Sequence, residues 1–369
     1  MRSPGFIALT LLLLGAPGTR VQGALQANGF ASGARERSSA PRFHFVPLDT
    51  LRRVRFVVDR PPWAPMGTLL ALEGGGDSLL VYDPERPHQP PRLVHRSSGR
   101  MHWSPDGRWI ARLVAHLAPP FLPDTLLGVD TSTGAVDTLY VGKVWPYVWA
   151  SDGDLYVWPE GEGGGPERLA PPKAWRASWT PPRTPRPTLI LGQRWGEVSI
   201  GATRHRIPMM GLQRFAPGVH PRADRLPALD SLFRFENLLL EDALPERGLF
   251  LVSGPLSHGG RTTTLLVDDW GRLVGELPKD TTSWNPGPSC LISEGRIGLG
   301  AEVQSDGTEE GRILSARLVA IDVNWRWVVP IEGTGMGMTP WVSREGSFLA
   351  YLDPINGGIC VGKLVIEPR

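Results

Sequence analysis

The sequence predicts an all-β fold built from a short antiparallel unit that is repeated along the chain. Three observations support this prediction. A tight turn preceded by a tryptophan and followed by an apolar strand occurs four times. Hairpins of a second kind, in which a strand ends in aspartate, lie between these copies. The chain of 369 residues also carries 14 tryptophans, more than a soluble protein can leave exposed.

The clearest copy of the first hairpin spans residues 100–114. Trp103 precedes the turn Ser104-Pro105-Asp106-Gly107, and an alternating apolar run follows. Proline presets φ and glycine tolerates positive φ, so the turn is suited to join two strands of one sheet. Three weaker copies begin at Trp63, Trp149 and Trp341. Two further copies, whose turns have lost the pattern, begin at Trp179 and Trp284.

Each hairpin of the second kind lies about 20 to 40 residues after a hairpin of the first kind. One repeating unit therefore contains one hairpin of each kind, and the units repeat roughly every 40 to 50 residues. The hairpins of the second kind begin where strands end at Asp83, Asp130, Asp268 and Asp322. A four-stranded unit cannot bury both faces alone, so we expect the units to pack side by side around an axis. The prediction is a six- or seven-bladed β-propeller of four-stranded antiparallel blades, with seven the preferred count.

The tryptophans have two interpretations in such a repeat. The preferred one is that a large side chain at a fixed place fills the wedge between neighbouring blades. The alternative is that they form a sugar-stacking or quinone-type site.

The segment Trp103 to Ala111 carries the Trp-Ser-Pro-Asp-Gly turn and the Ile-Ala strand of WD40-like (PD40-type) repeats. In this respect the chain resembles the TolB-like family of β-propellers. The copies at Trp63, Trp149 and Trp341 match the motif in part, and the interval Thr180 to Lys279 matches it barely at all. The resemblance implies a propeller that binds other proteins or peptides at one face, although propellers host many unrelated activities.

The domain organisation follows from changes in composition. Residues 1–23 are predicted to be a signal peptide, since Arg2 precedes a short apolar core and small or modest residues precede a plausible cleavage site. The apolar core is too short for a stable membrane anchor, although a retained interfacial segment is the alternative. Residues 24–41 are expected to be a disordered leader, and 42–369 a single domain with an irregular insertion or degenerate blade at about 203–247. We therefore expect a periplasmic or secreted protein.

The last repeat, from Trp341 onward, has only about three strand-like runs. One of two short β-prone runs near the N-terminus, Phe43 to Val46 or Val54 to Val58, is therefore expected to complete it, because an unpaired sheet edge is unfavourable. The preferred run is Val54 to Val58.

Composition excludes several function classes. The charges of the 39 basic and 37 acidic residues nearly cancel, which argues against a protein that binds nucleic acid or binds membranes through a polybasic segment. No zinc-protease, Cys-x-x-Cys or nucleophile-elbow motif is present, so we expect no cofactor and no metal. The two cysteines, Cys290 and Cys360, can either be bridged or remain buried thiols. We expect a monomer.

The candidate ligand site is the set of loops that lead into the first strand of each blade, because these loops gather at one rim of a propeller. They carry aromatic, guanidinium, imidazole and hydroxyl groups but no carboxylate, which suits recognition of a protein, peptide or glycan better than acid/base catalysis. The alternative is a hydrolase or lyase acting on a carbohydrate or peptide, with carboxylates around the channel. The candidate residues are His102, Trp145, Tyr147, Trp175, Arg176, Ser283 and Thr339.

Overall fold

The structure is a computed structural model of the chain. Contacts divide the chain into two units, Met1–Arg35 and Glu36–Arg369, and every residue described below lies in the second unit. The predicted signal peptide and nearly all of the predicted leader lie outside the described residues. Within the described ranges no helix has the length and apolar character needed to cross a lipid bilayer. These ranges are 40–57, 61–96, 99–114, 123–159, 165–169, 185–200, 203–218, 220–226, 229, 239–255, 262–275, 290–305, 313–323 and 327–368.

Five sheets of three or four antiparallel strands come from consecutive parts of the chain, with their strands in chain order. The first sheet holds β2 (Val54–Phe56), β3 (Leu70–Gly74), β4 (Ser78–Tyr82) and β5 (Arg92–Arg96). The second holds β6 (Arg100–Trp103), β7 (Trp109–Val114), β8 (Thr125–Asp130) and β9 (Val136–Val141). The third holds β10 (Val144–Trp149), β11 (Leu155–Pro159) and β12 (Glu167–Leu169). The fourth holds β13 (Thr188–Ile200), β14 (Thr203–Ala216) and β15 (Arg222–Arg225). The fifth holds β16 (Leu239–Leu244), β17 (Leu249–Pro255), β18 (Thr262–Asp268) and β19 (Leu273–Gly275).

The remaining strands form one eight-stranded sheet in the order β20-β21-β22-β23-β1-β26-β25-β24. Two short 3-10 turns, η1 (Pro245–Arg247) and η2 (Ser293–Gly295), follow β16 and β20. The strands of this sheet are β20 (Cys290–Ile292), β21 (Ile297–Ser305), β22 (Ile313–Asp322), β23 (Val328–Glu332), β1 (Arg42–Arg52), β26 (Gly358–Glu367), β25 (Phe348–Asp353) and β24 (Met338–Val342).

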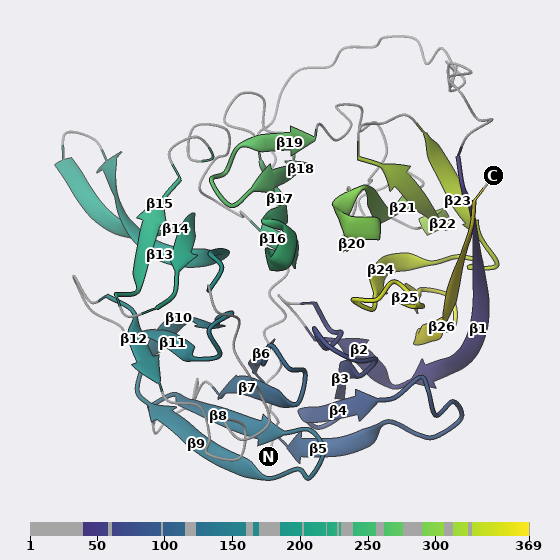
Figure 1. The fold of residues 1–369 in the computed structure, drawn as a ribbon, viewed down its shortest axis with the longest axis horizontal. Coiled ribbons are helices and arrows are strands. Elements are labelled where there is room, and N and C mark those ends of the chain that lie inside the picture. Colours follow the sequence, from purple (N-terminus) through teal and green to yellow (C-terminus); the bar gives the residue numbers. More distant parts are fainter. Residues whose placement is uncertain are drawn as a thin grey trace, which may run out of the picture. The chain divides into compact units, whose positions relative to one another are not determined.

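The sheets of the second unit follow one another around a ring in chain order (Figure 1). Contacts between β6 and β10 and between β16 and β20 bring the first strands of successive sheets together, and β20 also contacts β24 at the other edge of the eight-stranded sheet. The fold is therefore a β-propeller with blades of three or four antiparallel strands, as the repeat predicted in outline. The interval 203–247, predicted to be an insertion or a degenerate blade, contains β14, β15 and β16.

The N-terminal strand β1 closes the ring. It pairs antiparallel with β26 from Arg42↔Glu367 to Arg52↔Gly358, and parallel with β23 at Phe43↔Ile331 and His44↔Glu332. Of the two N-terminal runs expected to complete the last repeat, Phe43 to Val46 lies in β1 and does so, whereas residues 54–56 of the preferred run do not. Residues 54–56 are needed as the first strand of the first sheet, whereas β1 is long enough to cover β26 along its whole length.

A second contact fastens β1 to the first sheet. The Asp49 carboxylate accepts hydrogen bonds from the Tyr82 hydroxyl and, at 2.7 Å, from the His88 backbone N–H. Burial alone would raise the pKa of Asp49, but the hydrogen bonds from Tyr82 and His88 outweigh it and lower the pKa. The first and last parts of the ring are therefore joined by side chains as well as by strand pairing.

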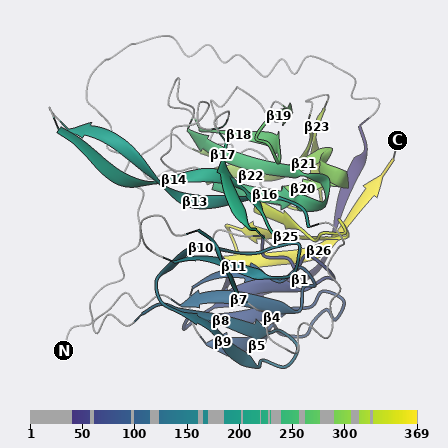
Figure 2. The same ribbon diagram turned by 60° about the vertical axis from the view of Figure 1, so that its left-hand side comes forward.

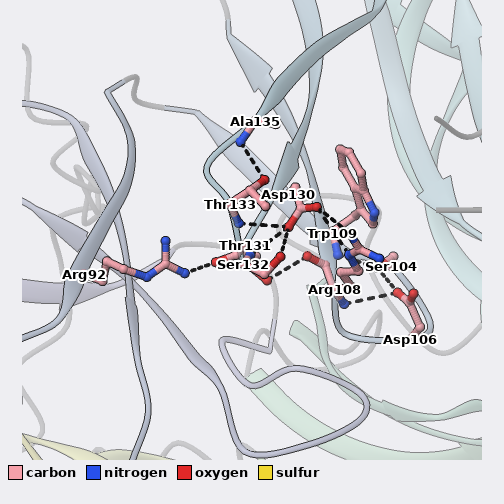
Figure 3. Close-up of polar contacts among 10 residues, drawn as sticks. All are labelled: Arg92, Ser104, Asp106, Arg108, Trp109, Asp130, Thr131, Ser132, Thr133 and Ala135. Carbon is pink, nitrogen blue, oxygen red and sulfur yellow. Dashed lines mark hydrogen bonds and ion pairs between the residues drawn. The ribbon is translucent and has the colours of Figure 1, made fainter. Parts of the chain in front are cut away.

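The turn after Trp103 shows why its sequence is suited to a tight hairpin (Figure 3). The Ser104 hydroxyl accepts a hydrogen bond from the Trp109 backbone N–H at 2.8 Å, and the Gly107 N–H donates to the Ser104 carbonyl at 2.9 Å. Gly107 has φ +70°, and a Cβ there would lie 2.5 Å from the carbonyl oxygen of Met66. Glycine is thus required both by the turn and by the close approach of the neighbouring blade.

The second turn of the same blade is held by a strand-terminal aspartate (Figure 3). One carboxylate oxygen of Asp130 accepts from the backbone N–H groups of Ser132 (2.8 Å) and Thr133 (3.2 Å), and the other accepts from Arg108 at 2.9 Å. Arg92 of the first sheet donates to the Thr131 carbonyl, which links the two blades. The aspartate at the end of such strands therefore has a structural role.

Three repeat tryptophans are buried, as the wedge interpretation predicted. Trp103 is 4% exposed and packs in a cluster with residues of the first sheet. Its Nε1 donates to the Pro62 carbonyl at 3.1 Å, and Nε1 of Trp63 donates to the Trp341 carbonyl at 3.0 Å. Each of these two indoles therefore fills a gap and bonds the backbone of the preceding blade, while Nε1 of Trp149 donates within its own turn.

Replacing Trp103 with alanine is expected to lower the free energy of unfolding by about 3 to 5 kcal/mol, through lost burial and the cavity left between two blades. Chemical denaturation of the purified variant measures this. The matched control is Trp270→Ala, because the Trp270 side chain is 53% exposed and its ring makes a cation–π contact with Arg214. The control should cost about 1 kcal/mol or less, and equal losses for the two variants would contradict the wedge role.

Candidate functional site

Two faces of the ring are defined by the direction of the strands. In the first three sheets the chain enters the first strand at the face that we call the loop face, whereas the first described strand of the fourth sheet, β13, runs in the opposite direction. The tight turns after Trp63, Trp103 and Trp149 lie at the opposite end of the sheets, which we call the turn face. Among the predicted ligand residues, those in the described part of the chain lie on first strands that start at the loop face: His102 on β6, Trp145 and Tyr147 on β10, and Thr339 on β24.

Two of the predicted residues lie on neighbouring first strands. His102 is half-buried on β6, where its Nδ1 donates to the Trp103 carbonyl at 2.9 Å. Tyr147 is 2% exposed on β10 and packs in the core between the second and third sheets. Its hydroxyl donates to the Arg100 carbonyl at 2.7 Å, so Tyr147 ties two blades together. The structure thus brings His102 and Tyr147 near each other, while ligand binding by either stays a prediction.

The other predicted residues are placed in part or not at all. Thr339 is exposed on β24 in the eight-stranded sheet and has φ +49°. Trp145 belongs to β10, but its side chain is outside the described part of the chain. The predicted residues Trp175, Arg176 and Ser283 lie outside the described residues.

A buried ion cluster lies in the loop-face half of the first two sheets. The Glu73 side chain on β3 is 7% exposed and that of Arg112 on β7 is completely buried, with Oε1 and NH2 3.6 Å apart. Arg55 on β2 donates from both Nε and NH2 to the other oxygen of Glu73 at 2.8 Å. One carboxylate is therefore held by two guanidinium groups from two blades.

Burial changes the protonation behaviour around this cluster. Loss of solvent lowers the pKa of Arg112, and the charge of Glu73 only partly opposes that effect. The pKa of His95 on β5 is lowered, first by burial and then by the nearby Arg112 cation. An imidazole with a lowered pKa stays neutral near pH 7, so the positive charge here comes from arginine.

A second buried carboxylate joins the fifth sheet to the eight-stranded sheet. Asp242 on β16 is 7% exposed and accepts from the backbone N–H of Leu291 at 2.7 Å and of Ala243 at 2.8 Å. Arg344, in the turn between β24 and β25, donates to the Ala243 carbonyl at 2.7 Å and pairs with Glu246 at 2.5 Å. Burial raises the pKa of Asp242 to about 6, although Arg344 lowers it.

Sequence reasoning missed both clusters, although a signal for each exists. Glu73 and Arg112 each interrupt an otherwise apolar strand, as does the pair Glu241-Asp242. A charge inside an apolar run has to be paired or hydrogen-bonded when it is buried. Two such interruptions of opposite sign in successive blades predict a pair, but only the strand register shows that Glu73 and Arg112 face each other.

The described residues include no group of three His, Cys, Asp or Glu side chains suited to a metal ion. Cys290 is buried and Cys360 is half-buried, and both are free thiols, which settles the alternative that the sequence left open. Burial raises the pKa of the Cys290 thiol, and the nearby Asp242 carboxylate raises it further. Cys290 therefore acts as a small apolar side chain in the core.

The chain is similar to several solved propeller structures. The β-propeller domain of the Trilobed protease from Pyrococcus furiosus is 11% identical, with 87% of this chain and 95% of that chain covered and a TM-score of 0.48. TolB from Acinetobacter baumannii is 14% identical, with 86% and 67% covered and a TM-score of 0.37. An oligogalacturonate lyase from Vibrio parahaemolyticus is 9% identical, with 89% and 97% covered and a TM-score of 0.41.

No family model and no curated protein matches the sequence. The description of the fold as a propeller therefore rests on the sheet pairings described above.

The raised pKa of Asp242 predicts a specific pH dependence of stability. The folded-state pKa of about 6 lies above the unfolded value of about 3.9, so between these values the folded protein holds a proton that the unfolded chain does not. The contribution of Asp242 to stability is therefore complete below about pH 4 and is lost as pH rises through about 6. The full change should be about 2 to 3 kcal/mol.

Denaturation midpoints measured from pH 4 to 8 test this expectation. Asp242→Asn should remove this part of the pH dependence. The buried neutral variant Ile292→Val on β20 serves as the control and should keep the dependence of the wild type. Parallel stability curves for the wild type and Asp242→Asn would contradict the assignment.

Proposed function

We propose that this protein is an exported, non-catalytic β-propeller that binds a protein, peptide or glycan partner in the cell envelope through its loop face. The predicted signal peptide supports export to the periplasm or the medium. No nucleic acid and no stable membrane anchor is part of the proposal, and the protein is expected to act as a monomer.

The observation that carries the proposal is that polar groups near the loop face form ion pairs and hydrogen bonds between neighbouring blades. Glu73 is held by Arg55 and Arg112, so its carboxylate is engaged in ion pairs with two guanidinium groups. A general acid or base instead needs access to substrate and a pKa near the working pH. Tyr147 is likewise engaged between two blades. These groups make the face rigid, as a preformed recognition surface requires.

We further propose that the ring has seven blades. The buried apolar residues of the described part form seven clusters, one between each pair of neighbouring blades when the eight-stranded sheet is counted as two. Among the described residues, strand pairing joins the two halves of this sheet only at the two parallel pairs of β1 with β23. The halves are β20 to β23, and β24 to β26 completed by β1.

One observation favours the alternative, a hydrolase or lyase acting on a carbohydrate or peptide. Glu241 and Asp242 are consecutive on the first strand of the fifth sheet, and burial raises the pKa of both. Carboxyl groups with raised pKa values are typical general acids. Asp242, however, is bonded to two backbone N–H groups, and Glu241 accepts a hydrogen bond from Ser253, so both have structural partners.

The test is partner recovery from an envelope extract. Immobilised wild type should retain a partner that the double variant His102→Ala, Thr339→Ala retains much less, because both residues lie on first strands that start at the loop face. The control Arg86→Ala, Arg272→Ala changes two exposed residues of the turn face. Equal recovery by a folded double variant would move the site, and substrate turnover by the wild type that Glu241→Gln abolishes would establish the alternative.

A further inference from the structure

Basic residues gather at the loop-face end of the first two sheets. Six arginine and lysine residues lie there, in the connections or in the half of the strand nearest that face, together with only three carboxylates. The cations are Arg53, Arg55, Arg96, Arg100, Arg112 and Lys143, and the carboxylates are Glu73, Asp77 and Asp124. We call these nine residues the basic rim.

The turn-face end of the same two sheets has the opposite balance. Its described residues include three arginines and five carboxylates. The arginines are Arg86, Arg92 and Arg108, and the carboxylates are Asp83, Glu85, Asp106, Asp130 and Asp137. The near-zero net charge of the chain therefore hides a separation of charge between the two ends of these two sheets, and it does not exclude an anionic ligand at the basic rim.

Exposure makes the basic rim more positive than the count suggests. Arg53, Arg96, Arg100 and Lys143 are exposed, and the Arg55 side chain is 69% exposed. Among the carboxylates Glu73 is buried and Asp124 is half-buried. Most of the cations are arginines, whose planar guanidinium groups bind carboxylates in a bidentate manner. A ligand approaching this rim therefore meets guanidinium groups suited to carboxylates.

A second feature of the loop face favours an extended polypeptide over other anions. The hairpin of β13 and β14 has 13 residue pairs, whereas the third strand β15 covers β14 only from Gln213 to Ala216. The β14 edge over residues 203–212 has no neighbouring strand among the described strands, and Figure 2 shows the hairpin projecting from the ring. An open strand edge can take up another strand through backbone hydrogen bonds.

The direction of this hairpin places its free end at the loop face. Arg186, two residues before β13, is hydrogen-bonded to Ser151 in a tight turn of the third sheet. The Arg186 backbone N–H donates to the Ser151 hydroxyl at 2.7 Å, and the same hydroxyl donates to the Arg186 carbonyl at 3.0 Å. β13 therefore starts at the turn face and runs toward the loop face. The residue pairs from Gly192↔Gly211 to Ile200↔Thr203 therefore extend past the loop-face end of the fourth sheet.

We propose that the loop face docks an acidic, extended segment of a partner protein, with the basic rim attracting its carboxylates and the free edge of β14 pairing with its backbone. The proposal rests on the proposed function and specifies the chemistry of the partner. A polypeptide with carboxylates on alternate residues satisfies both features, because one side of such a strand is acidic while its backbone stays free to pair.

The probe is a synthetic peptide of 12 residues that alternates Glu with Thr or Val, labelled with a fluorophore. A peptide with Lys in place of Glu is its control. Anisotropy titrations at low salt should show binding of the acidic peptide alone, weakening as salt is raised. The variant Arg53→Glu, Arg96→Glu should bind on the order of tenfold more weakly or worse, while Arg86→Glu, Arg272→Glu on the turn face should bind like the wild type.

The edge is tested separately with a shortened hairpin, in which residues 194–209 are replaced by Asn-Gly so that the pairs next to the blade remain. This variant should also bind the acidic peptide more weakly, and circular dichroism verifies its fold. Unchanged binding by the shortened hairpin, unchanged binding by the rim reversal, or no binding by the wild type would overturn the proposal.

Three further probes cover other anions: an oligouronic acid, a single-stranded oligonucleotide and vesicles containing an anionic lipid. Rim-dependent binding of one of these without binding of the peptide would also overturn the proposal, in favour of that class. Partner recovery from envelope extract separates the two levels: recovery unaffected by the rim reversal leaves the proposed function standing without this inference, and no recovery by the wild type contradicts the function itself.

Discussion

The constraint on which the rest of the structure depends is that every sheet has two apolar faces and cannot cover either by itself. Each face is covered by the next sheet, so the sheets have to continue until the last one meets the first. The wedge-shaped gaps between twisted sheets need large side chains, which explains the buried indoles of Trp63, Trp103 and Trp149. Arg92 and Tyr147 then lock neighbouring blades through backbone carbonyls, and Asp49 secures the closure.

Much of the architecture could be predicted because it is encoded locally. The hairpin around Trp103 is specified by four turn residues, and strand-terminal aspartates such as Asp130 mark the second hairpin. Closure of the ring by an N-terminal strand could be expected, but the strand itself could not be identified from the sequence. Both β1 and residues 54–56 contain β-prone runs, and only tertiary pairing decides which one covers β26. The long β13–β14 hairpin was missed because its sequence has no clean alternation.

The candidate site was harder to predict than the fold, because local sequence does not show which side chains from separate blades face each other. Tyr147 carries the aromatic and hydroxyl groups expected of a ligand residue, yet its hydroxyl joins two blades. Glu73 and Arg112 are 39 positions apart and become partners only through the register of two sheets. Net charge has the same limit, since a sum over the whole chain does not show the difference in charge between the two ends of the first two sheets.

Closure by β1 also sets an order on folding. β1 is made before every other described strand, whereas its partner β26 is made after all of them. Until β26 has been made, β1 can form only its two residue pairs with β23, and the first sheet lacks the neighbour that covers one of its faces. The middle blades can form early from local hairpins, but the complete ring is a late, long-range event of the kind that slows folding. A chain truncated near its C-terminus would therefore lose the join between its two ends and not merely its last strand.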